Sequence, residues 1–152
     1  MGVFISIDYG SKKTGLATTD IKKLIASALA TVQTKDIISY LKKFNERNPI
    51  EKFIVGEPKQ KDGSPSIIET EISSFINSLS LNFPLISIER YDERYTSKIA
   101  LDFLIKSGAK KKTRKNKNLI DKISATIILQ SYLESKKIKS WYYQFQHTDL
   151  LF

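Results

Sequence analysis

Acidic residues in this chain stand where apolar segments end. One closes the run 3–8, three come after the runs 53–56 and 85–88, and one lies in the first turn of a predicted C-terminal helix. These acids are Asp8, Glu57, Asp92, Glu93 and Asp121. Because sites in sheets with helical crossovers gather at the carboxyl ends of strands, the five acids are the first candidates for a functional site.

Carboxylates that are brought together raise one another's pKa, so that one of them takes up a proton unless a cation is present. Mg²⁺ and Mn²⁺ prefer oxygen ligands, and two such ions about 4 Å apart can flank a scissile phosphate. One ion then activates the attacking water and the other stabilises the leaving oxygen. The acids therefore indicate a metal site for phosphodiester hydrolysis.

Each acid also has a simpler interpretation. Asp121 lies three residues after Asn118, where an acid favours a helix N-terminus, although it shares a helix face with the apolar Ala125. Glu57 and Asp92 fall in predicted loops, where most acids face solvent. Asp8 ends an apolar strand and needs a partner if it is buried. The spacing leaves open which of Glu57, Asp92 and Glu93 is the second metal ligand.

The elements that would position these acids follow from the apolar pattern. Short apolar runs predict strands over 3–8, 16–19, 25–34, 53–56 and 85–88. Helical spacing predicts helices beginning at Thr34 or Asp36, at a Ser66–Glu69 capping box, at Ser97 and at Asn118, with the last reaching about Lys137. Three closely spaced strands followed by alternating helices and strands predict an α/β fold. Its five-stranded mixed sheet has three antiparallel strands first and is flanked by helices.

The bulk properties fit one small domain with a polyanionic partner. The chain has 152 residues, a net charge of +9 and a pI of about 9.6. This charge favours binding to nucleic acid or to an acidic membrane surface. The chain has no cysteine, which excludes disulfides and cysteine-ligated zinc. No apolar run approaches the length of a membrane span, and the N-terminus resembles a strand rather than a signal peptide, so we expect a cytoplasmic protein.

Basic residues gather just before Asp121 and at the first predicted turn. The candidate nucleic-acid contacts are Lys12, Lys13, Arg94, Lys110, Lys111, Lys112, Arg114, Lys115 and Lys117. The run 110–117 is too charged to pack into a core, and it could hold a phosphate backbone close to the metal ligands. Arg94 could pair with an acid or contact phosphate. The aromatic tail 138–152 could stack on bases but is better suited to packing on its own core or on a second subunit.

Several motifs, taken in order, resemble the YqgF family, also called Holliday junction resolvase-like proteins or pre-16S rRNA nucleases. The matching segments are Asp8-Tyr9-Gly10 with Thr14-Gly15, Val55-Gly56-Glu57-Pro58 with Asp62-Gly63, Asp92-Glu93-Arg94 with Thr96, and Arg114 followed by Asp121-Lys122-Ile123-Ser124-Ala125 and 128–134. The resemblance runs from about residue 3 to residue 137. It implies an RNase H-like nuclease domain over 1–137, whereas the aromatic C-terminal tail over 138–152 carries no motif that matches the family.

What the family resemblance implies is metal-dependent hydrolysis of phosphodiester bonds, with a role in maturing the 5′ end of 16S rRNA. The resemblance carries over Asp8, Glu93 and Asp121 as catalytic residues and metal ligands. The cofactor that it implies is two Mg²⁺ or Mn²⁺ ions. The sequence departs from the family at Glu57, where many members have an apolar residue. Glu57 and Asp92 therefore remain possible additional acids.

Three classes of function compete. The first is a hydrolase of ester bonds, a nuclease acting on structured RNA or, alternatively, a resolvase of branched DNA. The second is a binding module without catalysis, which has no need of three acids that repel phosphate. The third is an actin-like or sugar-kinase phosphotransferase, which needs two such domains. We expect nucleic acid as partner, with ribosomal precursor particles possible, no membrane, and a monomer or weak homodimer.

Neutralising the lysines and arginine of the run 110–117 to glutamine should weaken nucleic-acid binding, because these charges release counterions from phosphate. The slope of log K against log salt should also become shallower, which fluorescence anisotropy at several salt concentrations would measure. An unchanged slope would remove this run from the interface.

Overall fold

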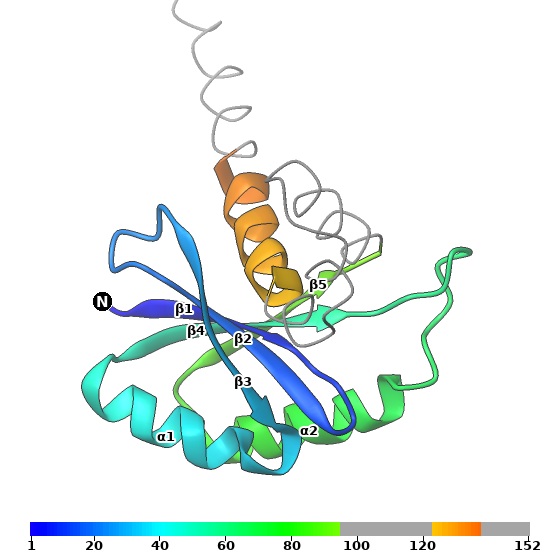
Figure 1. Cartoon of the computed structure of the whole chain (residues 1–152), viewed down its shortest axis with the longest axis horizontal. Coiled ribbons are helices and arrows are strands. Elements are labelled where there is room, and N and C mark those ends of the chain that lie inside the picture. The colour runs from blue at the N-terminus through cyan, green and yellow to red at the C-terminus, as the bar shows by residue number, and fades with distance from the viewer. Residues whose placement is uncertain (95–122, 138–152) are drawn as a thin grey trace, which may run out of the picture.

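The computed structural model describes residues 1–94 and 123–137, and its centre is a five-stranded sheet in the order β3-β2-β1-β4-β5 (Figure 1). The predicted mixed sheet is confirmed. Strand β1 (Val3–Asp8) occupies the middle, because its apolar residues can be covered on both faces. The acid that ends this strand is therefore brought to the centre of one sheet edge.

The first three strands form the predicted antiparallel meander. Strand β1 pairs with β2 (Lys13–Thr19), and β2 pairs with β3 (Ala26–Gln33). Strand β2 begins three residues earlier than its apolar pattern indicates, because Lys13 still pairs with Gln33 across the ladder. This register places Asp8 opposite Gly15, beside the turn between β1 and β2.

The other two strands run parallel to β1. Strand β4 (Ile50–Glu57) pairs with β1, and β5 (Ser87–Asp92) pairs with β4. Strand β5 starts and ends later than the predicted run 85–88. It continues through the polar residues 89–92 because their backbone groups complete the ladder with β4 and their side chains find charged partners. The carboxyl ends of β1, β4 and β5 therefore meet at one edge.

Each face of the sheet has its own apolar cluster. Helices α1 (Ile37–Arg47) and α2 (Glu69–Asn82) cover one face, where Ile5 and Phe53 are fully buried. The helix over 123–137 lies across the other face, as Figure 1 shows, and packs on Ala17 and Ile54. Successive residues of a strand point to opposite faces, so each position along β1, β4 and β5 is assigned to one helix layer. Among the described residues no helix is long and apolar enough to span a membrane.

The helix starts differ in detail from the expected caps. Asp36 stands at the N-cap of α1, after a short 3₁₀ turn over Thr34–Asp36, but its side chain makes no capping hydrogen bond. The expected Ser66–Glu69 capping box does not form. The Glu69 carboxylate instead accepts two hydrogen bonds from Arg90 on β5, at 2.6 and 3.1 Å. A bidentate charged pair is stronger than a neutral cap, so Glu69 ties α2 to the sheet.

Several sequence predictions lie outside the described residues. They concern the helix expected from Ser97, the basic run 110–117, the beginning of the last helix with Asp121, and the tail 138–152.

The hydrogen bonds from Arg90 hold the pKa of the Glu69 carboxyl below its ordinary value, against the effect of partial burial. Because the pKa of Glu69 is lower in the folded state, this carboxyl stabilises the protein at pH values above its unfolded-state pKa of 4.5. This stability is lost as the pH falls through the folded-state pKa. Glu69→Gln should therefore reduce the free energy of unfolding by about 1 kcal/mol at neutral pH and by less in acid. Urea unfolding at two pH values would measure this difference. Glu46→Gln, at an exposed position of α1, serves as the control, and an equal loss in both variants would contradict the assignment.

Candidate active site

Asp8 and Glu93 meet on the sheet face that carries the helix over 123–137. Along β1, Phe4, Ser6 and Asp8 point to this face, because the residues between them belong to the core under α1 and α2. The Ser6 hydroxyl donates a 2.6 Å hydrogen bond to the carbonyl of Ala125 in the helix over 123–137. Glu93 follows β5, and its backbone N–H donates to the Glu57 carbonyl at 3.1 Å. The ladder thus continues for one more residue, which turns Glu93 towards Asp8.

Gly56 makes this meeting possible. Strand β4 lies between β1 and β5, and Gly56 is the β4 residue between the two acids. A Cβ atom at this position would overlap the Glu93 carboxylate, closer than real Cβ atoms come to other atoms. The missing side chain therefore leaves room for Glu93 to reach across β4 to the Asp8 carboxylate.

The environment of Glu93 disfavours its charged form. Burial, together with the charge of Asp8 and a hydrogen bond with it, raises the pKa of Glu93 from 4.5 to about 8. At neutral pH the side chain of Glu93 is therefore largely protonated when no cation is bound. Strong perturbation by burial and a like charge is typical of functional carboxylates.

Glu57 and Asp92 point to the other side of the sheet. They lie opposite each other in the β4–β5 register. The residues before them, Gly56 and Tyr91, belong to the face that carries Asp8, so Glu57 and Asp92 belong to the other face. Lys59 contacts both carboxylates, at 2.9 Å from Glu57 and 3.8 Å from Asp92. Arg90 lies 3.9 Å from Glu57. Cations thus compensate both acids without a metal ion.

Arg94 is engaged with Asp92 in the structure. Its Nε donates to the Asp92 carboxylate at 2.9 Å, and its backbone N–H donates at 3.0 Å. Burial would raise the pKa of Asp92, but these hydrogen bonds and the charges of Arg94 and Lys59 lower it. This pairing favours Glu93 over Asp92 and Glu57 as the partner of Asp8.

The pair Asp8–Glu93 has the donor chemistry for a divalent cation. Its carboxylate oxygens are the ligands that Mg²⁺ and Mn²⁺ prefer, and a bound cation would remove the cause of the raised pKa of Glu93. Within residues 1–94 and 123–137, no three acids come together closely enough to form a metal cluster. The third predicted acid, Asp121, lies outside this part of the chain.

A shallow basic pocket lies at the same edge of the sheet. It has a volume of about 360 Å³ and is lined by Ser11, Lys12, Lys13, Gln33 and Lys35. The sequence pattern singled out Lys12 and Lys13. It missed Lys35, because only the pairing of β2 with the end of β3 brings the segment 33–35 beside the first hairpin.

Comparison with known proteins decides the family. A family model described as "RuvX: Holliday junction resolvase" matches residues 2–135. The chain belongs to the RuvX family. Curated RuvX relatives carry the name "Putative pre-16S rRNA nuclease". The relative from Phocaeicola vulgatus is 47% identical over 137 residues, which are 90% of this chain and 99% of the relative. The relative from Flavobacterium psychrophilum is 48% identical over 132 residues, 87% of this chain and 96% of the relative.

Solved structures confirm the predicted RNase H-like fold of this RuvX protein. The Thermus thermophilus RuvC structure with a Holliday junction substrate has a TM-score of 0.51 at 16% identity and covers 84% of this chain and 92% of RuvC. The Fowlpox virus resolvase with Holliday junction DNA has a TM-score of 0.53 at 20% identity and covers 88% of this chain and 97% of the resolvase. Family and relatives together place the RuvX chain among nucleases, which are hydrolases of ester bonds, as its motifs predict.

The sequence alone missed two parts of the site. Gly56 belongs to the motif Val55-Gly56-Glu57-Pro58, but nothing in its spacing shows that it makes room for Glu93. The sorting of Glu57 and Asp92 to the opposite face was also missed. Alternation along β5 could have indicated it, had the strand been extended to Asp92.

A substitution at Glu93 should stabilise the metal-free RuvX protein. Because the folded-state pKa is raised from 4.5 to about 8, the native state loses stability as pH rises through this interval. Glu93→Gln removes the loss and keeps a donor for Asp8, so we expect a gain of about 1 to 2 kcal/mol near pH 8 and little at pH 4.5. Thermal unfolding in chelator at both pH values would measure it. A variant that is less stable than the wild type at the higher pH would contradict this account.

Proposed function

We propose that Asp8, Glu93 and Asp121 bind two Mg²⁺ or Mn²⁺ ions and form the catalytic centre of a phosphodiesterase. The observation that carries this proposal is the contact between the half-buried Glu93 and Asp8, which raises the pKa of Glu93 so that it holds a proton at neutral pH when no cation is present. Bound at these carboxylates, the ions would activate the attacking water and stabilise the leaving oxygen. Within the described site, Asp8 and Glu93 supply oxygen ligands, Gly56 leaves the space, and the ladder to β4 fixes their orientation.

Asp121 is proposed as the third acid on the basis of its place in the sequence. It comes four residues before Ala125, whose carbonyl accepts the hydrogen bond from Ser6. Ser6 in turn lies two residues before Asp8 on the same face of β1. One helical turn before Ala125 is therefore a position from which a carboxylate could join Asp8 and Glu93.

Basic residues around this edge would hold the substrate. Lys12 and Lys13 line the pocket beside the first hairpin, with Lys35 as an additional contact. The run 110–117 would add charge close to Asp121. Arg94 donates hydrogen bonds to Asp92 in this structure. It would contact phosphate only by giving up this partner. Such contacts position a nucleic acid without reading its sequence.

The substrate that we propose is structured RNA, with maturation of the 5′ end of 16S rRNA as the reaction. The names of close relatives that align over almost their whole length support this choice. Branched DNA is the second candidate, because the family description and the solved neighbours concern Holliday junctions. A binding module without catalysis is less consistent with the Asp8–Glu93 pair, since a pair of adjacent carboxylates repels phosphate.

We further propose that the chain has two parts. Residues 1–137 would form the catalytic unit and 138–152 an accessory tail. A role in rRNA maturation would place the protein in the cytoplasm, in contact with ribosomal precursor particles. Both a monomer and a weak homodimer are compatible with this role.

Asp8→Asn should fold normally and lose Mg²⁺- or Mn²⁺-dependent cleavage, because one carboxylate ligand is replaced by a neutral amide. Pre-16S rRNA and a four-way DNA junction should be tested side by side with Mn²⁺ and with chelator. We expect loss of cleavage by about two orders of magnitude or more, and preference of the wild type for the RNA.

Folding and metal binding can be checked without activity. Mn²⁺ should raise the melting temperature of the wild type but not that of Asp8→Asn or Glu93→Gln. The matched control is Glu46→Gln, at an exposed acid near the end of α1, which should keep both responses. Retained cleavage by purified Asp8→Asn would rule out the mechanism, and equal inactivity of the wild type on both substrates would favour the binding module.

A further inference from the structure

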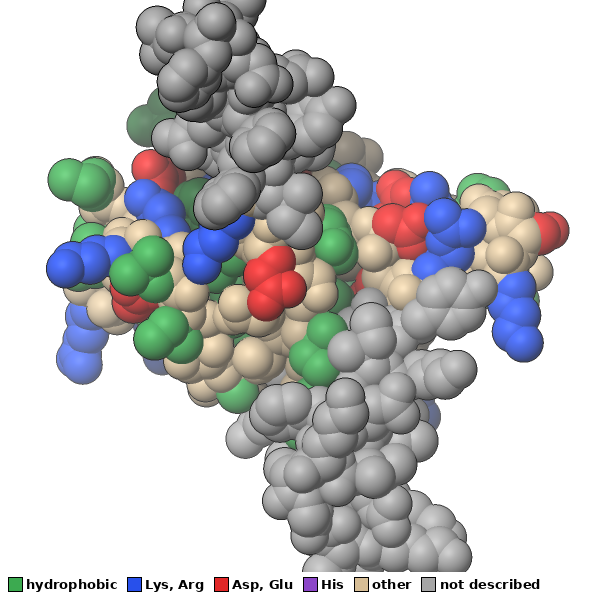
Figure 2. Space-filling view, turned by 90° about the horizontal axis from the view of Figure 1, so that it is seen from above, with side chains coloured by type: hydrophobic (Ala, Val, Ile, Leu, Met, Phe, Trp, Pro, Cys, Tyr) green, Lys and Arg blue, Asp and Glu red, His purple; other side chains and the backbone are tan. Residues whose placement is uncertain are grey.

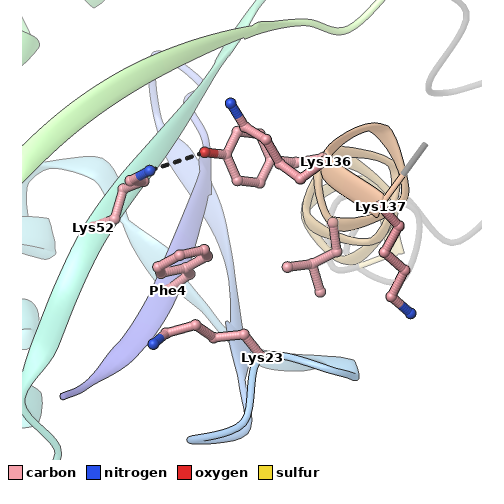
Figure 3. A pocket seen from close by; sticks show the side chains of 7 residues that line it. Phe4, Lys23, Lys52, Lys136 and Lys137 are labelled. Carbon is pink, nitrogen blue, oxygen red and sulfur yellow. Dashed lines mark hydrogen bonds between the residues drawn. The ribbon is translucent and has the colours of Figure 1, made fainter. Parts of the chain in front are cut away.

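A second basic pocket lies at the opposite edge of the sheet from Asp8 and Glu93. Its volume is about 440 Å³, and Phe4 and Tyr132 form part of its apolar wall. Four lysines from three segments line this pocket, as Figure 3 shows. They are Lys23 of the β2–β3 hairpin, Lys52 of β4, and Lys136 and Lys137 at the end of the helix over 123–137.

The aromatic rings hold three of these ammonium groups in place. Lys23 and Lys52 lie 5.4 and 5.2 Å from the centroid of the Phe4 ring, and Lys136 lies 5.3 Å from that of Tyr132. Such cation–π contacts orient a lysine without neutralising it. The ammonium groups are therefore arranged in advance around the pocket.

Acids compensate this charge only in part. Lys23 pairs with Glu51 at 2.5 Å, and Lys52 pairs with Glu89 at 2.8 Å. Lys136 is 3.9 Å from the same Glu89. Within the described residues Lys137 makes no ion pair. Among the residues that the structure describes, four ammonium groups thus face two carboxylates, which leaves an excess of positive charge. In the face view of Figure 2, Lys and Arg side chains lie at both ends of the face, with Asp and Glu side chains among them.

Lys23 adopts an unusual backbone conformation in the β2–β3 hairpin. Its φ is +58°, a left-handed conformation that a lysine rarely adopts. The turn is held by the Asp20 carboxylate, which accepts hydrogen bonds from the N–H groups of Leu24 and Ile25 at 2.8 and 2.9 Å. Asparagine or glycine would suit this position better, so the lysine is not explained by the turn.

The pocket and the acid pair open on the same face of the sheet. Phe4 and Asp8 are four residues apart on one face of β1, a distance of about 13 Å along the strand. The helix over 123–137 lies between them, because Ser6 contacts Ala125 and Phe4 packs edge-on against Tyr132. A ligand that touches both places must therefore pass beside this helix and span this distance along the face of the sheet.

We propose that this pocket binds phosphates of a second segment of the nucleic-acid substrate, remote from the cleaved bond. The proposal rests on the proposed function for the nature of the ligand. Its chemistry is that of phosphodiester groups, for which an array of lysines that outnumber their acidic partners is suited. The pocket would select substrates with a duplex or a folded region over single strands that are too short to span the distance of about 13 Å between the two places.

The chain offers a matched pair of variants to test this. Lys136→Gln/Lys137→Gln removes two adjacent helix lysines from the pocket, and Lys42→Gln/Lys43→Gln removes two adjacent exposed lysines from α1 on the other face. Binding to a labelled RNA duplex of about two helical turns, and to a short single-stranded RNA, is measured in chelator by fluorescence anisotropy. Because no cleavage occurs in chelator, failure of the nuclease function would not disturb this comparison.

We expect the pocket variant to raise the dissociation constant for the duplex by about five- to tenfold and to make the salt slope shallower by about one to two. The short strand and the α1 variant should change little. The proposal is overturned if the pocket and α1 variants behave alike, or if the pocket variant weakens the short strand as much as the duplex.

Lys23→Asn provides an independent test with a separate readout. Asparagine accepts the left-handed conformation, so the melting temperature should stay the same or rise, while the dissociation constant for the duplex should increase several-fold. A lower melting temperature with unchanged duplex binding would show that Lys23 serves only the fold, and would contradict the proposal.

Discussion

The contact between the carboxylates of Asp8 and Glu93 is the constraint on which the site depends. It brings like charges together in a largely buried place, so the native state tolerates it only with a proton or a cation. Three features of the fold are needed to produce it. Strands β1, β4 and β5 must run parallel, the ladder must extend past Asp92, and β4 must carry glycine at position 56.

The sheet also separates functional acids from structural acids. On the face of α1 and α2, Glu57, Asp92 and Glu69 are each balanced by Lys59, Arg90 or Arg94. On the other face, Asp8 and Glu93 face each other. Alternation along the strands places neighbours such as Asp92 and Glu93 in opposite electrostatic environments. Asp92 of this neighbouring pair is therefore stabilised as an anion by Arg94 and Lys59, while Glu93 lies against the like charge of Asp8.

The helix over 123–137 connects the two ends of the second face. Ala125 packs beside Ser6, near the acid pair, and Tyr132 packs beside Phe4, near the lysine pocket. Tyr132 also donates a hydrogen bond to Glu89 at 2.7 Å, which anchors the helix to β5. This one helix therefore packs on β1 both near the acid pair and near the second basic pocket.

The sequence by itself determined the order of the elements, the antiparallel start of the sheet and the family. Apolar runs and motif order depend on local residues, so they can be read without coordinates. The sequence also placed five acids at element ends, but it could not choose among Glu57, Asp92 and Glu93. That choice depends on how far β5 extends and on what lies beside it, because a shift of one residue moves every side chain to the other face. Only the tertiary structure supplied the partners of Glu57 and Asp92, the space above Gly56 and the lysine pocket, because each joins segments that are distant in the chain.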